Sequence, residues 1–313
     1  MHGRPGALPY RRAMNDATPS AVFGPVTVYF GEKTGKYPDG NLVVVRGRDA
    51  TAVFDTPQVA ARVPQVLDEA DLIIQGHVHE DHMVGLRRLR EVPLHVHEAD
   101  VDAARSWQGL SRHYGYDTPV LEGLRTKIEA QFDYAPRPDA LAYVDDQCWD
   151  LGGVRVRAVH LPGHTAGHCA LVVEPHGVAF IGDIDLSGFG PYYGDATSDL
   201  GAFRRSIARL AELPAQVWIT SHHKGVVTER ADFDAKLQAF AARLDEREQR
   251  LLQMLAAGPR TFASLVRERL LYPPEHEELW VDAAESRSIA QHLAELQAAG
   301  RVRPLDASRW ALA

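Results

Sequence analysis

Cysteine is scarce in this chain of 313 residues, because only Cys148 and Cys169 occur. Their spacing shows no pairing pattern, so neither a disulfide framework nor a thiolate zinc site is expected. Long apolar runs are missing too, since no uninterrupted stretch approaches the ~20 residues that span a bilayer. Residues 1–7 also lack the apolar core of a secretory signal. We therefore predict a cytoplasmic protein with no membrane span.

A surplus of positive charge is also absent. Lys and Arg number 34 against 42 Asp and Glu, which gives a formal net charge of −8. This balance argues against strong non-specific binding to nucleic acid, whose affinity comes from phosphate contacts. Two divalent cations in a cleft would add about four positive charges that the count ignores. We therefore expect a small-molecule substrate, anionic or neutral, and leave RNA open as a partner.

The most informative motif lies at residues 77–82, which read His-Val-His-Glu-Asp-His. It follows a short apolar run that is typical of a strand. In an extended segment alternate side chains share a face, so His77, His79 and Asp81 are expected to point the same way. His82 then follows as the chain turns. Imidazole and carboxylate are ligands that Zn²⁺ favours, so the motif predicts a metal site rather than a solvated polar loop.

Three more candidate ligands, His164, Asp183 and His222, each come where a predicted strand gives way to a loop. A rigid scaffold can hold side chains at such positions so that they converge on one point. The last position has an alternative, because His223 follows directly. We favour His222, since it comes first after the strand.

Asp55 also ends a predicted strand, and with it the candidate residues resemble the metallo-β-lactamase-fold hydrolase superfamily. The pattern of that family is an aspartate, HxHxDH, a lone His, a lone Asp and a final His. The resemblance covers roughly the first three quarters of the chain and implies an α/β (α+β) fold, a four-layer αβ/βα sandwich with two metal ions at one edge. It implies that His77, His79 and His164 bind one metal, that Asp81, His82 and His222 bind the second, and that Asp183 bridges them.

The resemblance also gives supporting roles to Asp55, which would hold the motif, and to His168, which would contact a ligand or the backbone. Asp185 fits a turn as well as a role in orienting a ligand. Tyr192 and Tyr193 lie in a glycine-rich loop and are candidate substrate contacts, against the alternative that they only anchor the loop. The other histidines are expected at the surface or as satisfied core residues: His95, His97, His113, His160, His176, His276 and His292.

The implied function is metal-dependent hydrolysis of an ester, thioester or lactone. Two metal ions can hold a bridging hydroxide and polarise a carbonyl oxygen. We expect zinc, with iron or manganese as alternatives, because His and Asp sites accept all three. Asp81 and Asp183 would be catalytic, since Asp81 would orient the water and Asp183 would bridge the ions. Three alternatives stay open: an endoribonuclease or phosphodiesterase on single-stranded RNA, a mononuclear iron dioxygenase, and a non-catalytic metal-binding protein.

The spacing of apolar residues predicts alternating strands and helices. The predicted strands are Val26–Phe30, Leu42–Arg46, Thr51–Asp55, Leu72–Ile74, Leu94–His97, Val154–His160, Ala170–Val173, Val178–Ile181 and Val217–Thr220. The predicted helices are Val59–Glu69, with Pro64 as a kink or a start, a segment after Met83, Val120–Phe132 and Leu200–Leu213. We divide the chain into a flexible leader (1–22), a catalytic domain (23–231) and a C-terminal domain (232–313).

From about Asp232 the sequence is rich in Ala, Leu, Arg and Glu, which is typical of a long helix. Further helices are predicted over Thr261–Leu270, capped by its threonine, and Ser286–Ala299, followed by short strands at Val302–Leu305 and Trp310–Leu312. Three helices and a hairpin resemble a winged helix, as in some lactamase-fold endoribonucleases. The third helix has no cluster of Arg or Lys, so we favour packing, homodimerisation or a substrate-lid role over nucleic-acid binding.

Overall fold

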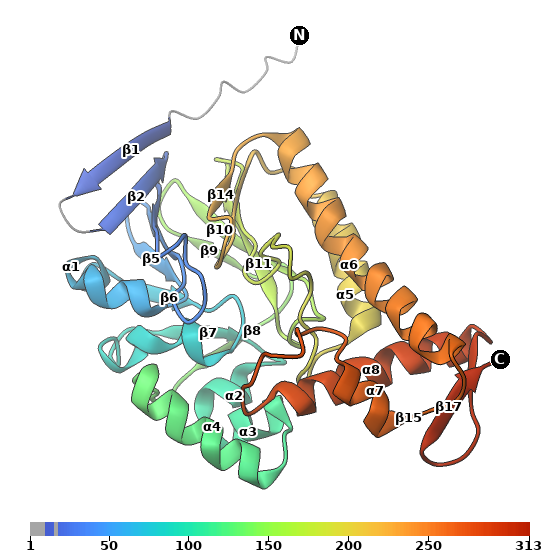
Figure 1. Cartoon of the computed structure of the whole chain (residues 1–313). Coiled ribbons are helices and arrows are strands. Elements are labelled where there is room, and N and C mark those ends of the chain that lie inside the picture. Colours follow the sequence, from blue (N-terminus) through green and yellow to red (C-terminus); the bar gives the residue numbers. More distant parts are fainter. Residues whose placement is uncertain (1–9, 16–17) are drawn as a thin grey trace.

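Two β-sheets form the centre of the molecule, and the computed structural model describes residues 10–15 and 18–313 (Figure 1). The strands of the first sheet follow one another in chain order. They are β1 (Tyr10–Asn15), β2 (Thr18–Phe23), β3 (Val26–Tyr29), β4 (Leu42–Arg46), β5 (Thr51–Phe54), β6 (Leu72–Ile74), β7 (Leu94–His97) and β8 (Leu141–Tyr143). Pairing is antiparallel from β1 to β5 and parallel from β5 to β8.

The second sheet has the order β14-β13-β12-β11-β10-β9. Its strands are β9 (Cys148–Asp150), β10 (Arg155–His160), β11 (Cys169–Glu174), β12 (Val178–Phe180), β13 (Val217–Ile219) and β14 (Val226–Val227). Only β12 and β13 pair in parallel, and helix α5 (Leu200–Ala211) makes the crossover between them. The other pairs are antiparallel.

Helices cover the outer face of each sheet (Figure 1). The first sheet packs against α1 (Pro64–Leu67), α2 (Val101–Arg105), α3 (Trp107–Tyr114) and α4 (Thr118–Gln131). The second packs against α5 and α6 (Arg230–Ala256). Between the sheets, Phe54 and Ile74 of the first share one buried apolar cluster with Phe180 and Ile219 of the second. This order of layers confirms the predicted αβ/βα sandwich.

The C-terminal part contains the expected long helix α6, two shorter helices and a hairpin. After α6 come β15 (Arg260–Thr261), α7 (Phe262–Glu268), α8 (Val281–Ala298), β16 (Val302–Pro304) and β17 (Arg309–Leu312). Thr261 caps α7, as predicted, because its side chain accepts a hydrogen bond from the Ser264 amide at 3.1 Å. Likeness to a winged helix stays a prediction, as does a division at residue 231, since one apolar cluster extends across that position.

Each predicted strand overlaps an observed one, and the differences lie in elements that were not predicted or were given other bounds. The expected leader over residues 1–22 is wrong for 10–15 and 18–22, which lie in β1 and β2; residues 1–9 and 16–17 lie outside the described residues. Strand β2 forms because Ala21 and Phe23 are buried against the second sheet. The predicted helix Val59–Glu69 is a 3₁₀ turn followed by α1, which begins at Pro64.

No helix in the described part of the chain is long and apolar enough to cross a bilayer.

Candidate metal centre

The backbone of the motif at residues 77–82 changes direction in its middle. His79 is extended, with φ −137° and ψ 162°, and a 3₁₀ turn then covers Glu80–His82. The expectation that Asp81 shares a face with His77 and His79 is therefore wrong, because alternation ends where the strand-like backbone ends. The turn sends the two halves of the motif to two neighbouring clusters of potential ligands.

The first cluster brings together three imidazole nitrogens. His79 Nδ1 lies 3.2 Å from His77 Nε2 and 3.1 Å from His164 Nε2. All three side chains are buried, and they come from segments that follow strands of both sheets. Asp183 completes the cluster, with Oδ2 at 3.4 Å from His164 Nε2 and 3.9 Å from His77 Nε2.

The second cluster contains Asp81, His82 and His222. Asp81 Oδ2 lies 3.1 Å from His222 Nε2 and 3.7 Å from His82 Nε2. Asp183 reaches this cluster with its other oxygen, since Oδ1 is 3.3 Å from His82 Nε2 and 3.5 Å from His222 Nε2. The carboxylate of Asp183 thus stands between the clusters, with one oxygen toward each.

Hydrogen bonds indicate which ring nitrogen carries the proton in two of the three histidines of the first cluster, His79 and His164. His79 Nε2 lies 2.8 Å from Asp195 Oδ2, and His164 Nδ1 lies 3.0 Å from the carbonyl oxygen of Tyr192. A carboxylate or a carbonyl can only accept, so these nitrogens donate. In the neutral rings, His79 Nδ1 and His164 Nε2 are therefore both lone-pair nitrogens, and they face each other at 3.1 Å. Two lone pairs at that distance fit a cation between them.

The same rule holds in the second cluster. His82 Nδ1 donates to Asp55 Oδ2 at 2.7 Å, and His222 Nδ1 donates to the carbonyl of Gly35 at 2.7 Å. In the neutral rings, both Nε2 lone pairs therefore point toward carboxylates, an arrangement that favours a proton or a cation on each nitrogen. No hydrogen bond satisfies the buried His82 Nε2 or Asp183 Oδ1 within the described part of the chain. This donor set fits a second cation.

The electrostatics of the clusters favour added positive charge. Burial lowers the pKa of His222, but Asp183 and Asp81 outweigh it and raise that pKa to about 10. Burial raises the pKa of Asp183, but the surrounding histidines hold it well below its usual range. A potential that retains protons on imidazole and keeps carboxylates ionised also attracts a metal ion.

The supporting residues lie where the sequence placed them. Asp55 accepts from the Gly76 amide at 2.7 Å through Oδ1 while Oδ2 holds His82. Its backbone has φ 53°, a left-handed conformation that aspartate tolerates better than most residues. His168 is fully buried, and its Nε2 accepts from the Asp183 amide at 3.1 Å. Both residues therefore contact a candidate ligand or its backbone.

The structure brings His222, and not His223, to the second cluster. The His223 side chain is 35% exposed and lies 3.6 Å from Asp185 Oδ2, outside both clusters. Its φ of 56° turns the chain directly after the ligand position. Of the two histidines after β13, the first therefore lies in the second cluster, as the sequence analysis favoured.

Tyr192 and Tyr193 differ from each other. Tyr193 is fully buried and its hydroxyl lies 2.8 Å from His292 Nε2, so its expected contact with substrate is wrong and the loop-anchor alternative describes it. Tyr192 lies beside the first cluster, because its carbonyl accepts from His164 and its hydroxyl donates to Asp195 Oδ1 at 3.2 Å. Its contact with substrate stays a prediction.

Several buried polar residues around the clusters were missed in the sequence. Asp195 holds His79 and accepts from the hydroxyl of Tyr116. Glu80 accepts from the hydroxyls of Tyr114 and of Tyr37, the latter at 3.1 Å. The available signal was the placement of Asp195 in the same aromatic loop as Tyr192. A lone carboxylate in a loop does not by itself reveal which residue it will meet.

The other histidines lie outside both clusters, although His113 is closer to the site than the sequence suggested. His113 and His292 are buried, and within the described part of the chain one ring nitrogen of each has no hydrogen-bond partner, so the expectation of satisfied core residues is wrong for these two. Its ring centre lies 5.6 Å from that of His79, and its Nδ1 is 3.2 Å from Thr197 Oγ1. The rings of His97 and His160 stack on each other, with 4.1 Å between their centres. None of these joins either cluster.

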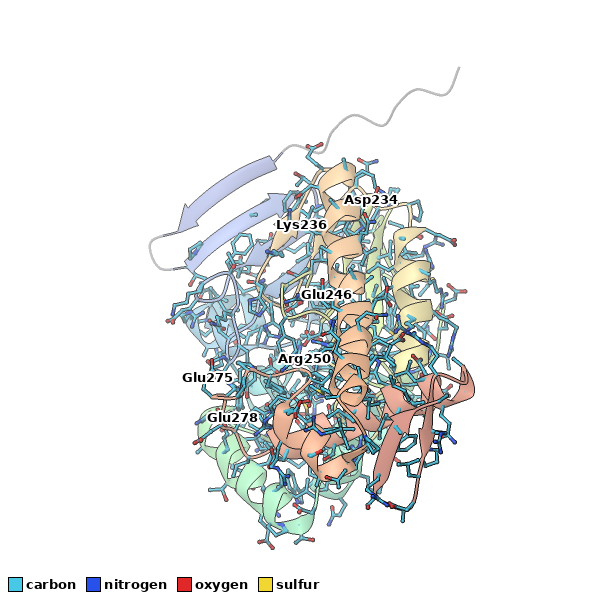
Figure 2. All side chains as sticks on the ribbon, turned by 45° about the vertical axis from the view of Figure 1, so that its right-hand side comes forward. Asp234, Lys236, Glu246, Arg250, Glu275 and Glu278 are labelled. Carbon is cyan, nitrogen blue, oxygen red and sulfur yellow. The ribbon has the colours of Figure 1, made fainter. Side chains whose placement is uncertain are left out.

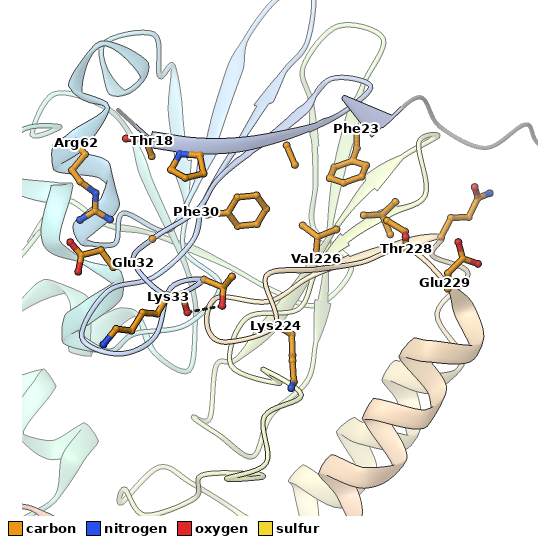
Figure 3. A pocket seen from close by; sticks show the side chains of 16 residues that line it. Thr18, Phe23, Phe30, Glu32, Lys33, Arg62, Lys224, Val226, Thr228 and Glu229 are labelled. Carbon is orange, nitrogen blue, oxygen red and sulfur yellow. Dashed lines mark hydrogen bonds between the residues drawn. The ribbon is translucent and has the colours of Figure 1, made fainter. Parts of the chain in front are cut away.

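Figure 3 shows a cavity of about 930 Å³. It is lined by β2, by the segment after β3 and by β14, with Phe30, Lys33 and Lys224 among its residues. None of the clustered His or Asp side chains lines it.

Comparison with known families gives one match. Residues 38–222 match the model of the metallo-beta-lactamase superfamily. That range begins before Asp55 and ends on His222, so it contains every candidate ligand.

Relatives of known name extend the similarity beyond that range. The Beta-lactamase-like protein 2 homolog of Drosophila melanogaster is 26% identical over 257 residues, covering 80% of this chain and 77% of that protein. An atrochrysone carboxyl ACP thioesterase of Pseudocercospora fijiensis is 25% identical, covering 82% of this chain and 67% of that protein. A hydroxyacylglutathione hydrolase of Methylococcus capsulatus is 29% identical, covering 73% and 78%.

Solved structures share the whole architecture. A beta-lactamase domain protein from Burkholderia ambifaria has a TM-score of 0.69 at 20% identity and covers 96% of each chain. A metallo-beta-lactamase family protein from Thermus thermophilus has a TM-score of 0.65 at 22% identity and covers 88% of this chain and 94% of its own. The first match includes the C-terminal helices, so the shared fold extends past residue 222.

Proposed function

This chain belongs to the metallo-beta-lactamase superfamily and is a hydrolase of that fold. We propose that it uses two divalent metal ions, preferably zinc, to cleave a thioester, ester or lactone in a small molecule. The observation that carries the proposal is the set of four imidazole lone pairs, on His79, His164, His82 and His222, that face Asp183 or one another in two adjoining clusters.

The ligand assignment follows the two clusters. His77, His79 and His164 would hold one ion, Asp81, His82 and His222 the other, and Asp183 would contact both. When bound, such ions polarise a carbonyl oxygen and supply a nucleophilic water at neutral pH.

The carboxylates of the chain orient that reaction. Asp81 lies between His82 and His222, which together hold its pKa below its usual range although burial raises it. An ionised carboxylate there accepts a hydrogen bond from the attacking water and fixes its direction. Asp183 keeps the two sites at a fixed separation, since each of its oxygens faces one cluster.

A thioester is the bond we place first. Two of the relatives are named as an ACP thioesterase and a hydroxyacylglutathione hydrolase. The fold alone does not choose the substrate, because one architecture hosts many chemistries. Lactone and oxygen-ester substrates are therefore included in the test.

The surface of the C-terminal part does not favour RNA. Figure 2 shows Asp234, Lys236, Glu246 and Arg250 along α6, so side chains of both signs of charge lie on one helix. Salt bridges pair several of these groups, such as Lys236 with Asp232. Phosphate binding needs basic side chains gathered on one face. We therefore propose a small-molecule substrate and a cytoplasmic enzyme, and a homodimer stays open.

The test combines elemental analysis of the purified chain with turnover assays on an acyl-glutathione thioester, a lactone, an aryl ester and a short single-stranded RNA. We expect about two zinc ions per chain and turnover of the thioester above the others. One iron per chain with oxygen uptake would replace the proposal with the dioxygenase alternative, and RNA cleavage alone would replace it with the nuclease.

The variant Asp81→Asn tests the mechanism within this assay. It keeps the size of the side chain but removes the negative charge that orients the water, so turnover should fall at least ~10³-fold. Circular dichroism should show the wild-type spectrum. Turnover at the wild-type rate would rule out this role of Asp81.

A further inference from the structure

We infer that helices α6 and α8 of the C-terminal part position His79 and His164 through hydrogen bonds to two loops, and thereby set the metal affinity of the first cluster but not of the second. The inference rests on the proposed metal binding. It assigns positioning roles to Arg247, Arg287 and Gln291, which come more than 20 residues after the last candidate ligand.

The first route begins at Arg287 on α8. Its guanidinium donates to the carbonyls of Tyr114 at 2.8 Å and Gly115 at 3.0 Å, where α3 ends. Gly115 is left-handed, with φ 63°, and closes that helix. A cation at the end of a helix satisfies carbonyls that have no partner within the helix. The Tyr114 carbonyl also accepts from the Ala196 amide at 3.0 Å, so Arg287 and Ala196 together hold the chain segment that carries Tyr114 and Tyr116.

Those two tyrosines contact the first cluster. The ring of Tyr114 stacks on His79 with 5.8 Å between ring centres and an angle of 5°. The hydroxyl of Tyr116 donates to Asp195 Oδ1, and the other oxygen of Asp195 holds His79 Nε2 at 2.8 Å. The position and the tautomer of His79 thus depend on the segment that Arg287 and Ala196 hold.

The second route begins at Arg247 on α6 and Gln291 on α8. Arg247 is 6% exposed and donates to the carbonyls of Pro191 and, at 2.6 Å, Phe189. Gln291 Nε2 donates to the carbonyl of Tyr193 at 3.0 Å. These contacts lie on both sides of Tyr192, and the carbonyl of Tyr192 accepts from His164 Nδ1 at 3.0 Å.

Gln291 also connects this loop to α5. Its Oε1 accepts from the Leu200 amide at 2.7 Å, in the first turn of that helix. The side chain of Gln291 therefore holds the loop through its NH₂ group and the start of α5 through its carbonyl oxygen. The buried polar groups are satisfied by each other, so loss of one partner leaves the other without a bond.

In the part of the chain that the structure describes, no hydrogen bond from α6 or α8 reaches the histidines of the second cluster. Its two histidines are oriented by Asp55, at the end of β5, and by the carbonyl of Gly35. Both of these precede the motif at residues 77–82. The asymmetry between the clusters predicts a selective effect, which a general loss of stability would not produce.

The experiment is a zinc titration of the full chain against a competing chelator, with wild type, Arg287→Met and Arg267→Met compared. Arg267 is an exposed arginine of α7 and serves as the matched control. We expect Arg287→Met to weaken one of the two zinc sites by ~10–100-fold, the range known for groups that orient a ligand. The other site and both sites of the control should keep the wild-type affinity.

Tyr116→Phe is the second variant, because it keeps the ring and removes only the hydroxyl that holds Asp195. It should weaken the same single zinc site with little change in melting temperature. Arg287→Lys retains one donor group, so its zinc affinity at that site should lie between those of Arg287→Met and wild type. Two unchanged sites in Tyr116→Phe and Arg287→Met, or equal loss at both sites, would overturn the inference. A wild type that binds no zinc would instead overturn the proposed function.

Discussion

At the scale of single residues, the metal centre depends on hydrogen-bond acceptors that orient four of its histidines. Each acceptor engages one ring nitrogen and leaves the other toward the candidate ligands. In four of the histidines, the nitrogen that bears the proton donates a hydrogen bond to a fixed acceptor. The acceptors are Asp195, Asp55 and two backbone carbonyls. The two carboxylate partners, Asp55 and Asp195, are buried with these hydrogen bonds formed. Their removal should therefore act on the tautomer of a ligand before it acts on folding.

Asp55→Asn tests this directly. Oδ1 and Oδ2 of Asp55 accept from the Gly76 amide and from His82 Nδ1, and asparagine can replace only one of these acceptors. His82 would then favour the tautomer with its proton on Nε2, toward the second cluster. We expect one zinc site to weaken at least ~10-fold in a chelator titration.

The positive φ at this position should not itself destabilise the variant, because asparagine tolerates a left-handed backbone. Asp49→Asn, at an exposed aspartate, is the control and should keep both sites. Two wild-type affinities in Asp55→Asn would mean that the tautomer of His82 is fixed by other contacts.

His292 gives a pH dependence away from the metal centre. Burial, with Arg204 and Arg247 nearby, lowers its pKa to about 3, whereas an unfolded histidine has a pKa near ~6.5. Below pH ~6.5 the unfolded chain binds a proton that the folded chain does not, so stability falls as the pH falls toward 3. This one group contributes up to ~1.4 kcal/mol per pH unit.

His292→Gln removes the titration and keeps an acceptor for the Tyr193 hydroxyl. Urea unfolding at pH 7, 6, 5 and 4 should show a smaller loss of unfolding free energy in the variant than in wild type. All other titrating groups are common to both proteins, so the difference belongs to His292. Parallel curves would show that His292 does not remain neutral in the folded state.

At the scale of elements, the sequence predicted the strands that carry the ligands, because each is a short apolar run ended by a turn. It could not predict β8 and β9, whose side chains are largely exposed and show no alternation. It also could not predict the 3₁₀ turn at Glu80–His82, which depends on backbone hydrogen bonds and not on residue type. The candidate ligands were identified by their pattern, whereas Asp195 was missed because its partner is distant in sequence.

Helix α6 is joined to the second sheet by an aromatic pair that can be tested. Phe233 stacks on Trp218 of β13 at 4.1 Å with an angle of 8°, and both side chains are fully buried. Phe233→Ala should lower the unfolding free energy by about 3–5 kcal/mol, since it leaves a cavity between helix and sheet. Urea denaturation measures the change.

Leu279→Ala is the matched control, because Leu279 is 50% exposed. It should change the unfolding free energy by less than ~0.5 kcal/mol. A similar small loss in Phe233→Ala would mean that α6 repacks on the sheet without this ring.

At the scale of the whole molecule, the candidate ligands come from both halves of the sandwich. Residues 77–82 follow β6 of the first sheet, and His164, Asp183 and His222 follow strands of the second. Bound ions would therefore add a further link between two sheets that meet through apolar contacts and through hydrogen bonds such as that from the Cys169 amide to the Gly76 carbonyl. Metal that binds only the folded chain stabilises it in proportion to RT ln(1 + [M]/Kd).

Removal of metal should accordingly lower the melting temperature. An ion present at about 100 times its Kd contributes ~2.7 kcal/mol, which is several degrees for a chain of this size. Scanning calorimetry with and without a chelator measures the shift. In Asp183→Ala, which loses the carboxylate that faces both clusters, the chelator should have little effect. A shift as large as in wild type would place the stabilising metal elsewhere.

The contacts of Arg287 with the end of α3 have a consequence for the order of events during synthesis. A chain leaving the ribosome N-terminal end first presents all candidate ligands once His222 has emerged, but it then lacks α8. At ~5–20 residues per second, several seconds pass before Arg287 reaches α3. A newly made chain would therefore capture its first ion at the cluster held by Asp55 and Gly35, and gain the other only after its last long helix has docked.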